Sequence, residues 1–417
     1  MKYFVITFGC QMNQSDTERI ETFLNSLGYE KDKENPDLLI VNMCSVRQSA
    51  VNRVFGLEKK IKNFKSKNKN FKAILTGCIT EKDKEKLKKI FDYVFKINEL
   101  FSFFKKEEIS PFKIYPKIRE KEFIGLVPIS RGCNLACAYC VVPFVRGRLV
   151  CRNPEEILNE IKEMIKNGVK EIWLLGQNVN DYYFPPFDFG DLVKEINNIE
   201  GKFWLRINSP HPMNFSEKII NILAQSLKFT PYLNLPLQSG DDLILKKMNR
   251  HYTTSDYRKL VKKIKTAFKK YRQGLEKNIA LSTDIIVGFP GEKEKNFENT
   301  KKILQEIKFD NVYLAKFSPR PKTAAEKMKD KVPEEEKEKR YQELMKLVSK
   351  ISFQKNLKFL GKEIQVLVIE KKKNFLFGKS RHFKTVKFEG SDSLIGKFVA
   401  VKISGVQDFG LIGQLKK

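Results

Sequence analysis

The stretch Arg131-Gly132-Cys133-Asn134-Leu135-Ala136-Cys137-Ala138-Tyr139-Cys140 places three cysteines in one short loop with C-x3-C-x2-C spacing. The loop directly follows an apolar stretch at residues 123–129 that has the length of a β-strand. Three thiolates can hold a [4Fe–4S] cluster and leave one iron open to a small molecule. A zinc site would require a fourth cysteine or histidine nearby, and this loop contains none. The sequence therefore predicts an iron–sulfur cluster on Cys133, Cys137 and Cys140.

The segment around this loop alternates between strand-length apolar stretches and amphipathic helical patterns. After residues 123–129, the predicted strands lie at residues 171–175, 203–207, 232–237, 280–288 and 312–317. One of the helices is predicted at residues 154–167, with Pro154 in its first turn and Gly168 at its end. This order predicts an incomplete TIM-like barrel of six β/α units at residues 120–350, with its active site at the carboxyl ends of the strands. A Rossmann-like open sheet is the alternative, but no G-x-G-x-x-G follows these strands.

Residues 1–115 show a similar alternation and are expected to form a separate doubly wound α/β domain. Strands are predicted at residues 3–8, 38–41, 73–75 and 93–95, and a helix at residues 17–27. Residues 105–121 are charged, contain Pro111 and Pro116, and are interpreted as a linker.

Cys10, Cys44 and Cys78 are predicted to lie at the carboxyl ends of the first three strands of this domain. Because these ends open onto one crevice in a parallel sheet, the three cysteines are expected to converge. A second three-thiolate [4Fe–4S] cluster explains them better than three separate core cysteines.

In the C-terminal part, the alternation of strands and helices gives way to one long helix and then to short strands. A charged and amphipathic helix is expected at residues 333–360, followed by short glycine-punctuated strands. Residues 354–417 are therefore predicted to form a small all-β barrel, a type that often binds oligonucleotides. Three basic residues of this barrel, Lys379, Arg381 and Lys384, are expected to be exposed and to contact phosphates.

The charge balance indicates a polyanionic partner. Lys and Arg number 79 against 50 Asp and Glu among 417 residues, so the net charge is 79 − 50 = +29. A surplus of this size favours nucleic acid as a partner, although a lysine-rich solvated surface would also produce it. No apolar stretch approaches the roughly 20 residues of a membrane-spanning helix, so we expect a soluble cytoplasmic protein.

The cysteine loop after the first strand of a partial barrel resembles the radical S-adenosylmethionine (SAM) superfamily. Further motifs resemble the methylthiotransferases within it, most closely the MiaB type. They are Thr7-Phe8-Gly9-Cys10-Gln11-Met12-Asn13, Cys44-Ser45-Val46-Arg47, Thr76-Gly77-Cys78, Leu175-Gly176-Gln177-Asn178-Val179-Asn180, Leu235-Pro236-Leu237-Gln238-Ser239-Gly240, Gly288-Phe289-Pro290-Gly291-Glu292 and Phe317-Ser318-Pro319-Arg320-Pro321. The terminal barrel resembles a TRAM domain, an RNA-binding module.

This resemblance implies a reaction and its partners. One SAM would methylate a sulfur held at the N-terminal cluster, and a second would be cleaved at the barrel cluster to a 5′-deoxyadenosyl radical. The radical would remove the C2 hydrogen of N6-isopentenyladenosine at position 37 of tRNA. The resulting carbon radical would then capture the methylthio group. A reductant such as flavodoxin or ferredoxin would supply the electron, and we expect a monomer.

Three alternatives remain at this point. Two are related enzymes, one acting on threonylcarbamoyladenosine in tRNA and one on an aspartate of a ribosomal protein. The third is a non-catalytic, metal-dependent RNA-binding protein.

Polar residues at the mouth of the predicted barrel are candidates for holding SAM, although such residues are also ordinary turn formers. The candidates are Tyr139, Gln177, Asn178, Ser209, Gln238 and Asp284. His211, beside Ser209, is a weaker candidate. Arg146, Arg148 and Arg320 could contact substrate or simply the surface. Among the three histidines we find no pattern for side-chain acid–base catalysis.

Three positions depart from the family pattern. Cys151 stands where the family usually has serine, and it is interpreted as a small packing residue rather than a ligand. Lys322 and Ala324 stand where the family commonly has glycine and proline.

Overall fold

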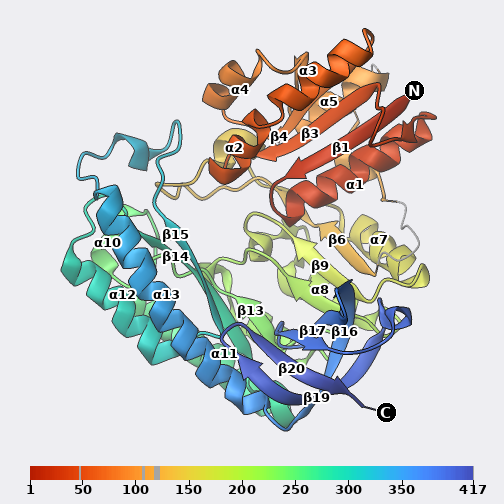
Figure 1. Ribbon diagram of the computed structural model, residues 1–417. Coiled ribbons are helices and arrows are strands. Elements are labelled where there is room, and N and C mark those ends of the chain that lie inside the picture. The colour runs from red at the N-terminus through yellow and green to blue at the C-terminus, as the bar shows by residue number, and fades with distance from the viewer. Residues whose placement is uncertain (47, 106–108, 117–122, 417) are drawn as a thin grey trace.

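The computed structural model describes residues 1–46, 48–105, 109–116 and 123–416, and Figure 1 shows their arrangement. The N-terminal part of the chain forms a five-stranded parallel sheet in the order β2-β1-β3-β4-β5. Its strands are β1 (Lys2–Phe8), β2 (Glu30–Lys31), β3 (Leu38–Cys44), β4 (Lys72–Cys78) and β5 (Tyr93–Val94). The predicted strands are present, and the two-residue edge strand β2 is an addition that its charged sequence does not indicate.

Helices cover both faces of this sheet, as a doubly wound fold requires. Leu38 and Ile40 of β3 pack toward α1 (Gln11–Ser26) and α5 (Ile97–Lys105). Leu39, Val41 and Met43 pack on the other face, toward α2 (Gln48–Phe55), α3 (Glu58–Lys67) and α4 (Glu81–Leu87). Burial on both faces explains why β3 is a continuous apolar run rather than an alternating one.

The central part is the predicted incomplete barrel. Its strands are β6 (Ile124–Pro128), β9 (Glu171–Leu175), β12 (Trp204–Ile207), β13 (Tyr232–Asn234), β14 (Ala280–Val287) and β15 (Asn311–Lys316). The strands β6, β9 and β12 pair in parallel, as do β13, β14 and β15, and a parallel bridge between Leu205 and Phe229 links the two sets. The spatial order follows the chain without reversal, which excludes the Rossmann-like alternative, because that fold reverses its strand order.

The helices of the barrel lie on its outside (Figure 1). They are α7 (Pro154–Lys166), α8 (Phe189–Asn198), α9 (Glu217–Gln225), α10 (Asp242–Lys247), α11 (Thr254–Tyr271), α12 (Glu294–Ile307) and α13 (Glu334–Asn356). The start of α7 is capped by the Asn153 side chain, which accepts a hydrogen bond from the amide of Glu155 at 2.8 Å. Among the described residues, no helix is long and apolar enough to span a bilayer.

The C-terminal strands close into a barrel in the order β16-β17-β18-β20-β19. They are β16 (Glu363–Lys372), β17 (Phe375–Ser380), β18 (Thr385–Phe388), β19 (Phe398–Gln407) and β20 (Gly410–Leu415). At Gly378 an added Cβ would lie 2.4 Å from the carbonyl oxygen of Leu367, so the two strands approach closely only because this residue is glycine. The mixed α/β architecture with a terminal all-β barrel is therefore confirmed.

The C-terminal barrel packs against the amino ends of the central strands. Phe398 of β19 contacts Trp204, the first residue of β12, with ring centroids 4.7 Å apart. Lys384 pairs with Asp310, the residue before β15, at 3.0 Å. This face is the end of the central barrel opposite to the carboxyl ends of its strands.

The expectation that Lys379, Arg381 and Lys384 form an exposed phosphate-binding stretch is wrong. The Lys384 side chain is 7% exposed and that of Arg381 is 17% exposed. Arg381 donates to the carbonyl oxygen of Leu227 at 2.7 Å, and the Lys379 amine donates to the hydroxyl of Thr385 at 2.7 Å. These cations face the interface with the central domain, which the local sequence alone does not reveal.

The predicted linker lies only partly within the described ranges. Residues 106–108 and 117–122 fall outside them, whereas Phe112 of the short helix η1 (Pro111–Lys113) packs its ring against the guanidinium groups of Arg131 and Arg152. The domain limits 1–115, 120–350 and 354–417 stay predictions.

A buried carboxylate joins the N-terminal domain to the central barrel. Glu160 of α7 accepts from Arg19 of α1 at 2.6 Å and from Arg152 at 2.6 Å. The side chains of Arg19, Glu160 and Arg152 are 1%, 2% and 0% exposed. Each charge is therefore compensated only by its partners, and the arrangement fixes how α1 sits on α7.

We expect Glu160→Gln to lower the free energy of unfolding by about 3–5 kcal/mol, because it removes the carboxylate paired with buried Arg19 and leaves buried Arg152 with the more distant Glu156, at 3.8 Å. Urea denaturation measures this effect. Glu163→Gln on the exposed side of the same helix is the matched control and should change stability by less than about 0.5 kcal/mol. Equal small effects of the two substitutions would contradict the structural role of Glu160.

Candidate active site

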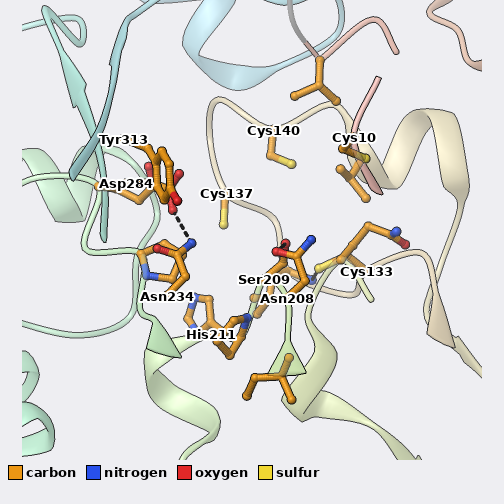
Figure 2. A pocket seen from close by; sticks show the side chains of 18 of the residues that line it. Cys10, Cys133, Cys137, Cys140, Asn208, Ser209, His211, Asn234, Asp284 and Tyr313 are labelled. Atoms are coloured by element: carbon orange, nitrogen blue, oxygen red, sulfur yellow. Dashed lines mark hydrogen bonds between the residues drawn. The ribbon is translucent and has the colours of Figure 1, made fainter. Parts of the chain in front are cut away.

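Cys133, Cys137 and Cys140 lie on the loop between β7 (Ser130–Arg131) and α6 (Val142–Arg146). At Gly132, φ is +80° and an added Cβ would come 2.1 Å from the carbonyl oxygen of Arg148, so the loop requires glycine there. The Cys140 amide donates to the carbonyl of Cys137 at 3.0 Å. All three cysteines border one cavity of about 490 Å³ (Figure 2).

The chemistry of this loop fits an iron–sulfur cluster. Burial raises the pKa of Cys133, and it raises that of Cys140 to about 12, so the protein alone disfavours the thiolates. A bound metal centre would supply the compensating positive charge. In the part of the chain that the structure describes, no group of three His, Cys, Asp or Glu side chains converges on one ion position. Three cysteine thiolates on one short loop suit a [4Fe–4S] cluster, in which each would bind a separate iron.

Cys10, Cys44 and Cys78 do come together in the N-terminal domain. Cys44 and Cys78 are direct partners in the register of β3 and β4. Cys10 lies two residues beyond β1, where it precedes the first turn of α1, rather than at the strand end itself. The Cys44 thiol is within hydrogen-bonding reach of both other thiols.

The shared hydrogen bonds make the three thiols inequivalent. Hydrogen bonding from Cys44 lowers the pKa of Cys10 to about 6, and it also lowers the pKa of the buried Cys78. The same hydrogen bonds raise the pKa of Cys44. The lowered pKa values of Cys10 and Cys78 bring both thiols closer to the thiolate form that a metal ligand requires.

Buried amides support these cysteines, although neither Asn13 nor Asn42 is among the predicted site residues. Asn13 donates to the side-chain oxygen of Asn42 at 2.9 Å and to the carbonyl of Met43 at 3.2 Å. Its own oxygen accepts from the Cys10 thiol at 3.4 Å. Both asparagines are fully buried. Asn42 interrupts the apolar run of β3, and an amide within a buried strand is the sequence signal that could have identified it, since buried amides need fixed partners.

Of the three arginines considered for substrate binding, Arg146 lies beside the N-terminal cysteines. Its Nε donates to the Cys78 sulfur at 2.8 Å, and a terminal nitrogen pairs with Asp16 at 2.7 Å. Arg148 is exposed. Arg320 is buried and donates to the Gln48 side chain at 2.8 Å. Arg146 therefore connects α6, directly after the cysteine loop, with the second cysteine group.

Five of the six residues predicted to hold SAM line the same cavity. They are Tyr139, Gln177, Ser209, Gln238 and Asp284, and Figure 2 shows Ser209 and Asp284 around the space below Cys137. Ser209 and Gln238 have φ of +55° and +73°, an uncommon conformation that often marks functional positions. The sixth, Asn178, is buried and accepts from Asn214 at 3.5 Å, outside the cavity lining.

Other polar residues of the cavity carried no sequence signal or only a weak one. Asn234 donates to the Asp284 carboxylate at 2.8 Å, and the dashed line in Figure 2 marks this bond. Arg250 donates to the Cys137 sulfur at 3.4 Å from a loop that no motif singles out. Burial and Arg250 lower the pKa of His211 to about 3, so its ring is neutral near pH 7.

Two of the three positions that depart from the family pattern have local explanations. Cys151 lies on β8 (Val150–Cys151), packs against the barrel core and accepts from the Tyr183 amide at 3.5 Å, away from the cavity. Lys322 has φ of +68°, the left-handed region that glycine adopts most easily. Lysine is tolerated there at some conformational cost.

Two family models match the chain. Residues 127–304 match the Radical SAM superfamily, and residues 2–97 match Uncharacterized protein family UPF0004. The first contains the Cys133–Cys140 loop, and the second contains Cys10, Cys44 and Cys78.

A solved structure supports the same fold. The radical S-adenosylmethionine methyltransferase TsrM from Kitasatospora setae, which was solved with cobalamin and a [4Fe–4S] cluster bound, superposes with a TM-score of 0.58 at 13% identity. The match covers 78% of this chain and 77% of TsrM.

Curated relatives align over nearly the whole chain. A tRNA-2-methylthio-N(6)-dimethylallyladenosine synthase from Clostridium botulinum (strain Langeland) is 40% identical over 99% of this chain and 96% of its own length. The enzyme of the same name from Dictyoglomus thermophilum is 39% identical over 99% of this chain and 98% of its own. Together with the architecture and the two cysteine groups, these matches show that the chain belongs to the tRNA-2-methylthio-N(6)-dimethylallyladenosine synthase family of radical SAM enzymes.

Proposed function

We propose that this chain is a tRNA methylthiotransferase that adds a methylthio group to C2 of N6-isopentenyladenosine at position 37 of tRNA. The observation that carries the proposal is a single cavity bordered by Cys10 of the N-terminal group and by all three cysteines of the barrel loop. A reaction that joins a sulfur to a base carbon needs the sulfur site and the radical site to face one substrate. The names of the aligned relatives favour this substrate over threonylcarbamoyladenosine or a ribosomal protein.

We assign one [4Fe–4S] cluster to Cys133, Cys137 and Cys140, and a second to Cys10, Cys44 and Cys78. When bound, the clusters and SAM supply the 5′-deoxyadenosyl radical and the methylated sulfur. The protein contributes charge and orientation around the sulfurs. Arg250 lies 3.4 Å from the Cys137 sulfur and Arg146 lies 2.8 Å from the Cys78 sulfur, and such hydrogen bonds stabilise thiolate ligands.

The polar lining of the cavity is proposed to hold SAM. Gln177, Ser209 and Gln238 follow successive barrel strands and present amide and hydroxyl groups at the carboxyl ends. Asn234 orients the carboxylate of Asp284, which suits an amino or hydroxyl group of the ligand. Tyr139 lies on the cysteine loop itself, with its ring edge against Phe289.

The remaining assignments concern partners. The net charge of +29 supports binding of tRNA through its phosphates, with the target base splayed out of the anticodon loop. The C-terminal barrel is proposed to be a TRAM-like RNA-binding domain. Exposed Arg148 and buried Arg320, which donates to Gln48, remain candidates for substrate contact. A reductant of the flavodoxin or ferredoxin type, a monomeric state and a cytoplasmic location complete the proposal.

Analysis of tRNA nucleosides by mass spectrometry tests the function directly. Deletion of the gene should abolish 2-methylthio-N6-isopentenyladenosine and let N6-isopentenyladenosine accumulate, and the wild-type gene should restore the product. An unchanged nucleoside profile, or a loss confined to a threonylcarbamoyladenosine derivative, would overturn the assignment.

The two cysteine groups should be separable. We expect Cys137→Ala to abolish 5′-deoxyadenosine formation, because it removes a thiolate of the loop that faces the SAM residues. Cys44→Ala should retain part of that cleavage and lose methylthio insertion. Chromatography of 5′-deoxyadenosine and of product tRNA measures both. Complete loss of cleavage in Cys44→Ala, with the barrel cluster still present, would show that the roles are misassigned.

Cys151→Ser should keep about eight irons per chain, the content of two [4Fe–4S] clusters, and should keep activity. Its sulfur accepts from the Tyr183 amide and packs against the barrel core, and serine is nearly the same size. Iron and sulfide analysis of anaerobically purified protein provides the measurement, and Cys133→Ser is the matched control that should lose about half of the iron. A similar loss in Cys151→Ser would refute the ligand set.

A further inference from the structure

A turn of the C-terminal barrel enters the amino end of the central barrel. Residues 380–384 connect β17 to β18, and the carbonyl oxygens of Ser380 and Arg381 accept from the Arg206 guanidinium at 2.9 and 3.1 Å. Arg206 is fully buried on β12, and its other hydrogen bonds go to Glu171 at 2.7 Å and Thr230 at 2.8 Å. The turn therefore accepts the remaining hydrogen bonds of the Arg206 guanidinium, which is buried inside the central barrel.

Phe383, at the tip of this turn, has a strained backbone. Its φ is +61°, a conformation that is rare for an aromatic residue and costs on the order of 1–3 kcal/mol. The turn is held by hydrogen bonds from the Phe383 amide to the carbonyl of Ser380 at 2.9 Å and from the Lys384 amide to the Ser380 hydroxyl at 3.1 Å. Favourable contacts of the Phe383 ring must offset this cost.

Those contacts lie inside the active-site cavity. The Phe383 ring packs against Tyr232 at 4.5 Å and Trp173 at 5.3 Å between ring centroids, and the Arg206 guanidinium lies 4.9 Å from its centre. All three aromatic residues line the cavity that also holds the barrel cysteines. We call Trp173, Tyr232 and Phe383 the aromatic end of the cavity.

The aromatic end lies away from the cysteine loop. Trp173 is in the middle of β9, and Tyr232 is the first residue of β13, whereas Gln177, Ser209 and Gln238 follow the carboxyl ends of their strands. The Arg206 guanidinium is already paired with Glu171, and the Lys379 amine donates to the Thr385 hydroxyl at 2.7 Å and lies 4.5 Å from the centre of the Phe383 ring. The three rings favour a flat ligand group at this end.

We propose that Phe383 of the C-terminal barrel contacts an adenine ring bound in the active-site cavity, so that this barrel is part of the active site. The inference deepens the proposed function and rests on it. Aromatic side chains bind nucleobases by stacking, and both substrates of the proposed reaction carry adenine. One adenine belongs to the tRNA nucleoside and the other to SAM, and the two sources predict different kinetic effects.

The experiment compares Phe383→Leu with Phe398→Leu in the reconstituted full-length enzyme. Both substitutions remove an aromatic ring from the interface between the C-terminal and central barrels, but Phe398 packs on Trp204 and does not line the cavity. Phe383→Tyr keeps the ring and should restore the wild-type values. Phe383→Met, which retains volume without a ring, replaces Phe383→Leu if the latter does not fold.

Two readouts separate the sources of adenine. Contact with the tRNA base should lower methylthio product per 5′-deoxyadenosine about tenfold in Phe383→Leu, the effect of losing a base–aromatic stack, while KM for SAM without tRNA stays unchanged. Contact with SAM should instead raise that KM about tenfold. Either result supports the proposal, provided that Phe398→Leu and Phe383→Tyr behave like wild type.

Equal values for Phe383→Leu and Phe398→Leu in both readouts, with an active wild-type enzyme, would overturn the inference and leave the proposed function intact. A wild-type enzyme that cleaves SAM but forms no methylthio product on N6-isopentenyladenosine tRNA would instead refute the proposed function. The two failures are therefore distinguishable.

Discussion

The buried carboxylate of Glu160, held between Arg19 and Arg152, is the contact on which the geometry of the active site depends. It joins α1 of the N-terminal domain to α7 of the central barrel through hydrogen bonds of 2.6 Å on each side. Because α1 begins next to Cys10, its placement on α7 also determines where Cys10 meets the cavity. Because buried charged groups are stable only beside their partners, the Glu160 contacts favour a single orientation of the two domains.

Buried guanidinium groups recur where the three parts of the chain meet. Arg146 of α6 reaches Asp16 and Cys78 of the N-terminal domain, and Arg206 of β12 donates to the backbone carbonyls of the C-terminal turn. In both cases the cation is on the central barrel and two of its hydrogen-bond partners come from another part of the chain. Planar guanidinium groups with several fixed donors are well suited to specify orientation.

The cavity that results has two chemically different regions. Cysteine sulfurs and polar side chains surround one end, and Trp173, Tyr232 and Phe383 form the other. The N-terminal domain contributes Cys10 and the C-terminal barrel contributes Phe383. All three parts of the chain therefore contribute residues to this one pocket.

Local sequence determined much of this protein. The C-x3-C-x2-C loop, the alternation of strands and helices, and the position of Cys44 and Cys78 at strand ends follow from residue type and spacing. Only the tertiary structure decided that Asn178 turns into the core, that Arg146 meets Cys78, and that Lys379, Arg381 and Lys384 face an interface. The physical reason is range: periodicity and spacing report contacts within one element, whereas the burial and pairing of a long polar side chain depend on segments far away in the chain.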